Sequence, residues 1–208
     1  MLKPEKTCWK GFFMKENAEL RAMARSQLKG AWLEAVGLIL VYWIIMGVSS
    51  MVMVGLLVLG GPLTLGLSGY FLKKPRGEAG KLENLFDGFK QFGSSFLLNL
   101  LQGIFIVLWS CLLIIPGIVK VFSYSMAFYI LKDNPDIGAL EAITQSREMM
   151  TGYKWKLFCL YFSFIGWALL CCLSFGIGFL WLVPYIETSG ANFYEELKKQ
   201  SPAAAVAA

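Results

Sequence analysis

The chain has 208 residues, of which 57% are hydrophobic and only 16% are charged, and its formal net charge is +5. A soluble domain is typically about 45–50% apolar and about 25% charged, because polar groups must cover its surface. This composition excludes an ordinary soluble enzyme, and the 15% of aromatic residues excludes a disordered chain.

The N-terminal stretch 1–30 is rich in lysine and arginine and contains no long apolar run. Apolar side chains recur at helical spacing within 17–29, at Leu20, Met23, Ala24 and Leu28. This periodicity predicts an amphipathic helix on the cytoplasmic side of a membrane, ending before Gly30.

Three long blocks, 31–72, 91–131 and 157–194, are almost free of ionisable side chains. As a helix, each block would be about 60 Å long, twice the thickness of the roughly 30 Å hydrocarbon core. Each block is therefore predicted to form two transmembrane helices joined by a turn. The predicted turns contain glycine, serine or proline and lie at 47–50, 116–117 and 175–178.

The predicted fold class is all-α, a polytopic transmembrane helical bundle of six spans arranged as three hairpins with amphipathic interfacial helices. It forms one membrane domain over 31–200, followed by a disordered tail at 201–208. The fourth span is short and the sixth contains Pro184, so a re-entrant hairpin in the second or third block is the alternative. The predicted spans are 31–48, 51–72, 94–115, 118–132, 156–174 and 178–194.

The two connectors between the blocks are also predicted to be amphipathic helices. Residues 81–92 place apolar side chains at Leu82, Leu85, Phe86 and Phe89, as expected for a helix lying flat on the inner membrane interface. In 135–151, Asn134 is the expected cap and Pro135 the first helical residue, and the helix ends before Gly152.

Three glycines recur along the chain at similar intervals. Gly30, Gly88 and Gly152 end the three amphipathic segments and are 58 and 64 residues apart. Pro62 and Pro184 each follow the preceding glycine of this set by 32 residues. This spacing predicts a degenerate threefold repeat of about 60 residues.

Positive charge is confined to the segments that flank the hairpins. Of the 19 lysine and arginine residues, only Lys120 lies within an apolar block. The positive-inside rule therefore predicts that both termini and both connectors are cytoplasmic. Such juxtamembrane charge favours anionic inner-leaflet lipids as partners rather than nucleic acid.

Enzymatic chemistry has little support in the sequence. There is no histidine, and the five cysteines contain no C-x-x-C pair. No phosphate-binding loop, nucleophile elbow or dinucleotide motif occurs. We therefore expect no catalytic residues, no cofactor and no metal site.

Two sets of residues are candidates for binding. The first set comprises basic residues beside the hairpins that are expected to contact lipid headgroups, although ordinary inner-leaflet anchoring also accounts for them: Lys81, Lys90, Arg147 and Lys154. The second set comprises polar side chains inside the blocks, which either make interhelical hydrogen bonds, reach an interface or line a polar path: Glu187, Asn99, Gln102 and Lys120.

Several short stretches resemble the bacterial domain of unknown function 975 family. They include Phe122–Tyr129, Asp133–Asp136, Glu141-Ala142, Ser146-Arg147, Met150–Gly152, Phe164–Trp167, Gly176–Gly178, Pro184-Tyr185, Ala191–Tyr194 and Leu28–Trp32. The resemblance implies a multi-pass protein of the bacterial inner membrane and supplies no catalytic residue. We expect a non-enzymatic module that binds lipid, another amphiphile, a membrane partner protein or a second copy of itself. The alternative is a small transporter or efflux component with a polar path near Glu187, Asn99 and Gln102.

Overall fold

The computed structural model describes residues 15–50, 53–112, 114–174 and 176–200, and these segments are helical with short turns. The helices follow one another in three units of similar order. The first unit contains α1 (Asn17–Gln27), α2 (Trp32–Ser50) and α3 (Met53–Lys73). The second contains η2 (Leu82–Gln91), α4 (Phe92–Leu112), α5 (Ile114–Tyr124) and α6 (Ala127–Asp133). The third contains α7 (Ala139–Met149), α8 (Lys154–Phe162), α9 (Ile165–Leu173) and α10 (Phe179–Gln200).

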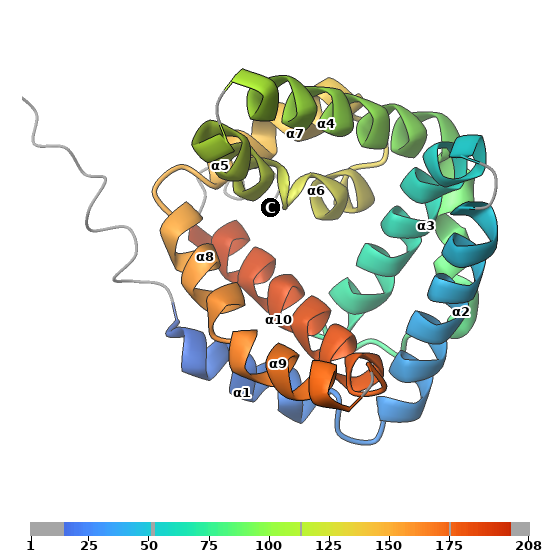
Figure 1. Cartoon of the computed structure of the whole chain (residues 1–208), viewed down its shortest axis with the longest axis vertical. Coiled ribbons are helices and arrows are strands. Elements are labelled where there is room, and N and C mark those ends of the chain that lie inside the picture. Colours follow the sequence, from blue (N-terminus) through green and yellow to red (C-terminus); the bar gives the residue numbers. More distant parts are fainter. Residues whose placement is uncertain (1–14, 51–52, 113, 175, 201–208) are drawn as a thin grey trace, which may run out of the picture.

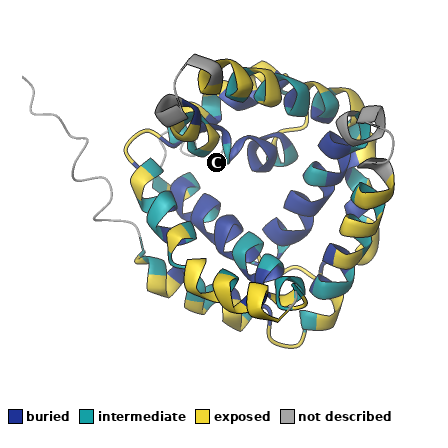
Figure 2. Ribbon diagram, in the orientation of Figure 1, coloured by how far each residue is buried: buried dark blue, intermediate teal, exposed yellow. Residues whose placement is uncertain are grey.

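The helices form an inner and an outer layer. In Figure 1, α3, α6 and α10 lie inside a ring that includes α1, α2, α4, α8 and α9. Figure 2 shows that the inner helices are mostly buried, whereas the outer helices expose much of their surface. The exposed surface includes large apolar side chains on three outer helices, among them Ile44, Val107 and Leu169.

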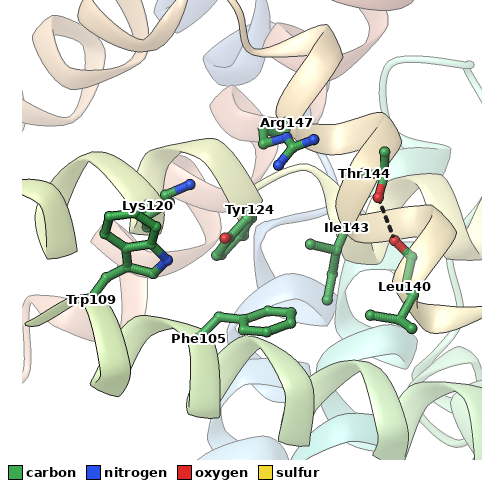
Figure 3. A pocket seen from close by; sticks show the side chains of 8 residues that line it. All are labelled: Phe105, Trp109, Lys120, Tyr124, Leu140, Ile143, Thr144 and Arg147. Carbon is green, nitrogen blue, oxygen red and sulfur yellow. Dashed lines mark hydrogen bonds between the residues drawn. The ribbon is translucent and has the colours of Figure 1, made fainter.

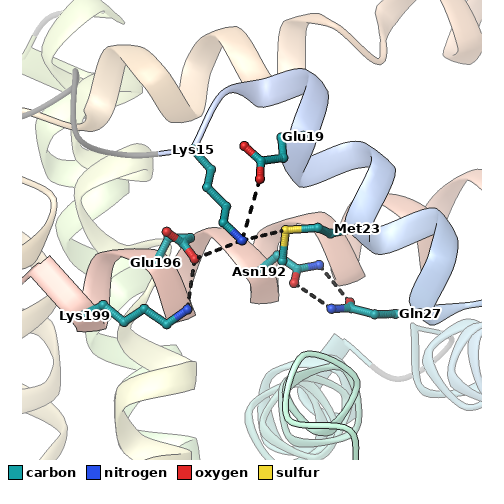
Figure 4. Close-up of polar contacts among 7 residues, drawn as sticks. All are labelled: Lys15, Glu19, Met23, Gln27, Asn192, Glu196 and Lys199. Carbon is teal, nitrogen blue, oxygen red and sulfur yellow. Dashed lines mark hydrogen bonds and ion pairs between the residues drawn. The ribbon is translucent and has the colours of Figure 1, made fainter.

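Each unit begins with a short helix that packs against the hairpin of the preceding unit. The 3₁₀ helix η2 contacts α2 and α3, α7 contacts α4 and α5, and α1 contacts α10. Figure 4 shows the last of these junctions, where Gln27 and Asn192 exchange two side-chain hydrogen bonds of 2.9 Å. The three units therefore close into a ring.

Glycines let the inner helix α3 approach its neighbours closely. A Cβ added at Gly61 would collide with the backbone of Ser95 on α4. One added at Gly66 would collide with the backbone of Leu85 on η2, and one at Gly88 with that of Pro62. Because backbones can pack this closely only where side chains are absent, these positions set the register between the first two units.

Serines coincide with the breaks in two helical segments. The hydroxyl of Ser125 donates to the carbonyl oxygen of Phe122 at 2.8 Å, between α5 and α6. That of Ser163 donates to the carbonyl oxygen of Leu160 at 2.6 Å, between α8 and α9. Such side-chain bonds compete with helical main-chain bonds and favour a break.

The prediction of six spans is not supported. Within the described residues, two helical stretches are long and apolar enough to cross a membrane, Leu82–Ser110 and Lys154–Leu173. A third is possible if α1 and α2, bent by 97°, are taken together as one span. The reasons are length and composition: the predicted fourth span is divided between α5, of 11 residues, and α6, of 7 residues. Helix α10, which contains the predicted sixth span, carries five charged side chains.

The predicted turns and connectors differ from the structure in detail. The turn predicted at 116–117 is helical, because α5 runs through it. The turn predicted at 47–50 is also helical, because α2 continues to Ser50. The turn predicted at 175–178 is observed at 176–178, while residue 175 lies outside the described residues. Helix α7 starts only at Ala139, because 134–138 form a turn and an extended Gly138 caps the helix.

The second amphipathic segment is a 3₁₀ helix, so residues three apart share a face. Leu85 and Gly88 are buried against α3, while Phe86 and Phe89 are exposed. A location of this segment at the membrane interface stays a prediction, as does the disordered tail, which lies outside the described residues.

Candidate functional site

A pocket of about 260 Å³ lies between α4, α5 and α7. Figure 3 shows the side chains that line it, which combine two cations with an aromatic and aliphatic wall. They are Phe105 and Trp109 from α4, Lys120 and Tyr124 from α5, and Leu140, Ile143, Thr144 and Arg147 from α7.

Three hydrogen bonds, two of them buried, hold the three helices in place around this pocket. Gln102 on α4 donates to the main-chain oxygen of Tyr124 at 2.9 Å. On α7, the hydroxyl of the fully buried Ser146 donates to the oxygen of Ser123 at 2.8 Å and accepts from the main-chain nitrogen of Met126 at 3.2 Å. Satisfied polar groups of this kind rigidify a packed interior, so the pocket is preformed.

The pocket is electropositive. The ammonium nitrogen of Lys120 is 4.5 Å from the ring centroid of Trp109 and 5.9 Å from that of Tyr124. Lys154, at the start of α8, is close enough to Lys120 and Arg147 to interact electrostatically with both. Within the described residues, none of these three cations is in an ion pair, so the site is suited to an anion.

The structure thus brings together residues from both predicted sets. Arg147, predicted as a headgroup contact, and Lys120, predicted as an intramembrane polar residue, both line this pocket. Lys154, the other predicted headgroup contact, interacts electrostatically with both but does not line it. Lys81 and Lys90 lie elsewhere, at the two ends of η2. The ammonium of Lys90 is paired with the carboxylate of Asp87 at 2.7 Å.

The other predicted polar residues lie against different helices. Asn99 lies close to Gly60 on α3, and Gln102 bonds to α5 as described above. Glu187, on α10, accepts a hydrogen bond from the hydroxyl of Tyr129 on α6 at 3.4 Å. Each of the three therefore contacts a residue on another helix.

The apolar residues that line the pocket were not among the site residues predicted from the sequence. The lining residues of the pocket occur in pairs four apart along one helix: 105 and 109, 120 and 124, 140 and 144, 143 and 147. This spacing places both members of a pair on one helical face and was visible in the sequence. Which faces would meet was not visible, because the three helices are brought together only by tertiary packing.

Among the described residues, no group of three histidine, cysteine, aspartate or glutamate side chains is placed to hold a metal ion. Comparison with curated proteins and with solved structures finds no match. The family described as Protein of unknown function (DUF975) matches residues 14–123 and 111–201. Because these two matches together span almost the whole chain, the protein belongs to this family.

Proposed function

We propose that this protein is a non-catalytic component of the bacterial cytoplasmic membrane that binds the phosphate headgroup of an anionic phospholipid in the pocket between α4, α5 and α7. The observation that carries the proposal is the clustering of Lys120, Arg147 and Lys154 beside an aromatic and aliphatic wall. Basic pockets between membrane helices are typical sites for such headgroups.

The chemistry of the pocket favours a phosphate group. A guanidinium can bind two phosphate oxygens at once, while ammonium groups act as point charges. A volume of about 260 Å³ suits a headgroup rather than a complete lipid. The acyl chains would then lie outside, along the exposed apolar surface of α4 around Ile104, Val107 and Leu108.

The membrane location rests on the two or three candidate spans and on the distribution of positive charge along the chain. By the positive-inside rule, the basic segment between the two candidate spans, which carries Lys120 and Arg147 and ends at Lys154, would be cytoplasmic, and so would the pocket. Anionic lipids give the inner leaflet a negative surface potential, which would concentrate positive charge at that face.

The test is a lipid titration of the full chain in an uncharged detergent, with bound lipids counted by native mass spectrometry. The probes are phosphatidylglycerol and phosphatidylcholine. The pocket variant carries Lys120→Gln, Arg147→Gln and Lys154→Gln. The matched control removes the same charge from exposed residues, by Lys29→Gln, Lys81→Gln and Lys90→Gln.

We expect one phosphatidylglycerol to bind tightly to the unmodified chain and the control. The pocket variant should bind it on the order of 100-fold more weakly, since each basic residue contributes about 1 kcal/mol. Equal weakening in both variants, or equal binding of phosphatidylcholine, would show that only general surface charge attracts the lipid, and would overturn the proposal.

A further inference from the structure

A second, larger cavity of about 390 Å³ lies between the first and third units. It is lined by Arg25 of α1, Trp32 at the start of α2, Trp167 of α9, and Trp181 and Tyr185 of α10. Three indole rings and a phenol ring make the wall predominantly aromatic, and one cation stands at its edge. The volume falls in the range of about 300–1,000 Å³ that is usual for small-molecule sites.

Arg25 is held in position by a buried aromatic side chain. Its guanidinium carbon is 5.7 Å from the ring centroid of Tyr185, and its Nη2 atom donates to the hydroxyl of that tyrosine at 3.4 Å. Tyr185 is only 8% exposed and is held edge-on by the ring of Phe164 at 5.1 Å. Within the described residues Arg25 is in no ion pair, so most of its five N–H donors stay available.

The cavity occupies the same place in the threefold arrangement as the phosphate pocket. In both cases the short helix of one unit packs against the hairpin of the preceding unit, α7 on α4 and α5 and α1 on α10. Arg25 and Arg147 each lie five residues before a glycine with positive φ, Gly30 and Gly152. The two arginines are therefore equivalent positions of the repeat.

The third equivalent place is closed. There η2 lies directly on α3, with the backbones of Gly66 and Leu85, and of Gly88 and Pro62, in close approach. Gly88 lies inside η2 and is not among the glycines with positive φ, so this junction has no counterpart of Arg25 and Arg147 defined in the same way.

We propose that this cavity binds one long-chain fatty acid, with its carboxylate on Arg25 and its hydrocarbon chain along Trp32, Trp167 and Trp181. A single guanidinium balances a single carboxylate and can bind both its oxygens, whereas the two cations that line the other pocket, with Lys154 near both, suit a phosphate group. The aromatic wall offers apolar surface to the chain. This site is independent of the phosphate pocket and does not rest on it.

Quenching of tryptophan fluorescence by 9,10-dibromostearate tests the proposal, using the full chain in an uncharged detergent. The variants are Arg25→Gln, Arg21→Gln on the same helix, and Arg147→Gln in the phosphate pocket. The methyl ester of the same acid, which has the chain but no carboxylate, is titrated against the unmodified protein. Thermal unfolding of each variant verifies that it is folded.

We expect saturable quenching in the unmodified protein and in Arg21→Gln and Arg147→Gln. Arg25→Gln should weaken binding of the acid at least about tenfold, because a hydrogen-bonded ion pair is lost. The ester should bind the unmodified protein as weakly. Equal binding of acid and ester would show that the cavity is only an apolar surface that takes up detergent or lipid. This result would overturn the proposal even if Arg25→Gln fails to fold. Loss of acid binding in Arg147→Gln but not in Arg25→Gln would also overturn it, because the acid would then occupy the phosphate pocket.

Discussion

The guanidinium of Arg76 donates a hydrogen bond of 2.8 Å to the carboxylate of Asp133 and so joins the first unit to the second. The same guanidinium contacts the carboxylate of Glu195 on α10 at 2.7 Å. Asp133 also accepts bonds from Tyr194 at 3.0 Å and from Lys198 at 2.8 Å. These contacts link the ends of α3 and α6 to α10, where all three units meet.

Replacing Asp133 by asparagine should destabilise the protein by about 1–3 kcal/mol. The Asp133 side chain is only 7% exposed, and loss of its charge leaves Lys198 without this counter-ion and Arg76 paired with Glu195 alone. The cost is below that of a fully buried pair because Arg76 and Lys198 remain partly solvated. Denaturant unfolding in an uncharged detergent measures it.

The control for this variant is Asp87→Asn. Asp87 pairs with Lys90, whose side chain is 79% exposed, so its loss should cost at most about 1 kcal/mol. If Asp133→Asn were no more destabilising than this control, the junction of the three units would not depend on the charge of Asp133.

The same junction should make stability dependent on pH in the acid range. Burial by itself would raise the pKa of Asp133, but the hydrogen bonds and positive charges of Arg76 and Lys198 outweigh burial and lower the pKa below its usual value. The stabilisation is therefore present above the unfolded-state pKa of about 3.9 and is lost as the pH falls through the lowered folded-state pKa.

The measurement compares the free energy of unfolding of the unmodified protein and of Asp133→Asn at pH 7 and at low pH. The difference between them should be largest at pH 7 and should shrink below about pH 4, because asparagine does not titrate. A difference that stays constant over this range would contradict the assignment of the effect to the Asp133 carboxylate.

Gly88→Ala should be severely destabilising, by about 3 kcal/mol or more. The added Cβ would collide with backbone atoms of Pro62 and Gly66 on α3, which cannot move away as a flexible side chain would. Gly103→Ala in α4 is the matched control, because nothing lies within 4 Å of its added Cβ. That variant should be neutral or stabilised by up to about 1 kcal/mol through better helix propensity. Unfolding curves that fail to separate the two would show that η2 does not pack tightly on α3.

Much of the helical organisation was predictable from local patterns. Helices occupy the stretches expected for α1, α2, α3, α4 and α10, because apolar runs and amphipathic periodicity are properties of adjacent residues. The family resemblance was confirmed. Helix boundaries were less predictable: α7 starts later than expected because the turn after Asn134 depends on the backbone of Gly138.

The candidate sites were predictable only in part. Arg147, Lys154 and Lys120 were found from their charge and position, but their convergence was not, because Lys120 and Arg147 lie 27 residues apart on different helices. Arg25 was not predicted at all. Its partner Tyr185 is 160 residues away and meets it only because α1 closes the ring against α10.

The sequence by itself determined that this protein is all-helical and rich in apolar residues, since composition and spacing report these properties directly. Only the tertiary structure decided which apolar helices lie inside. Hydropathy does not distinguish a surface that contacts lipid from one that contacts protein, because lipid chains are as apolar as leucine side chains. The sequence therefore does not show that α3, α6 and α10, which lie in the predicted spans, form an inner layer that other helices cover.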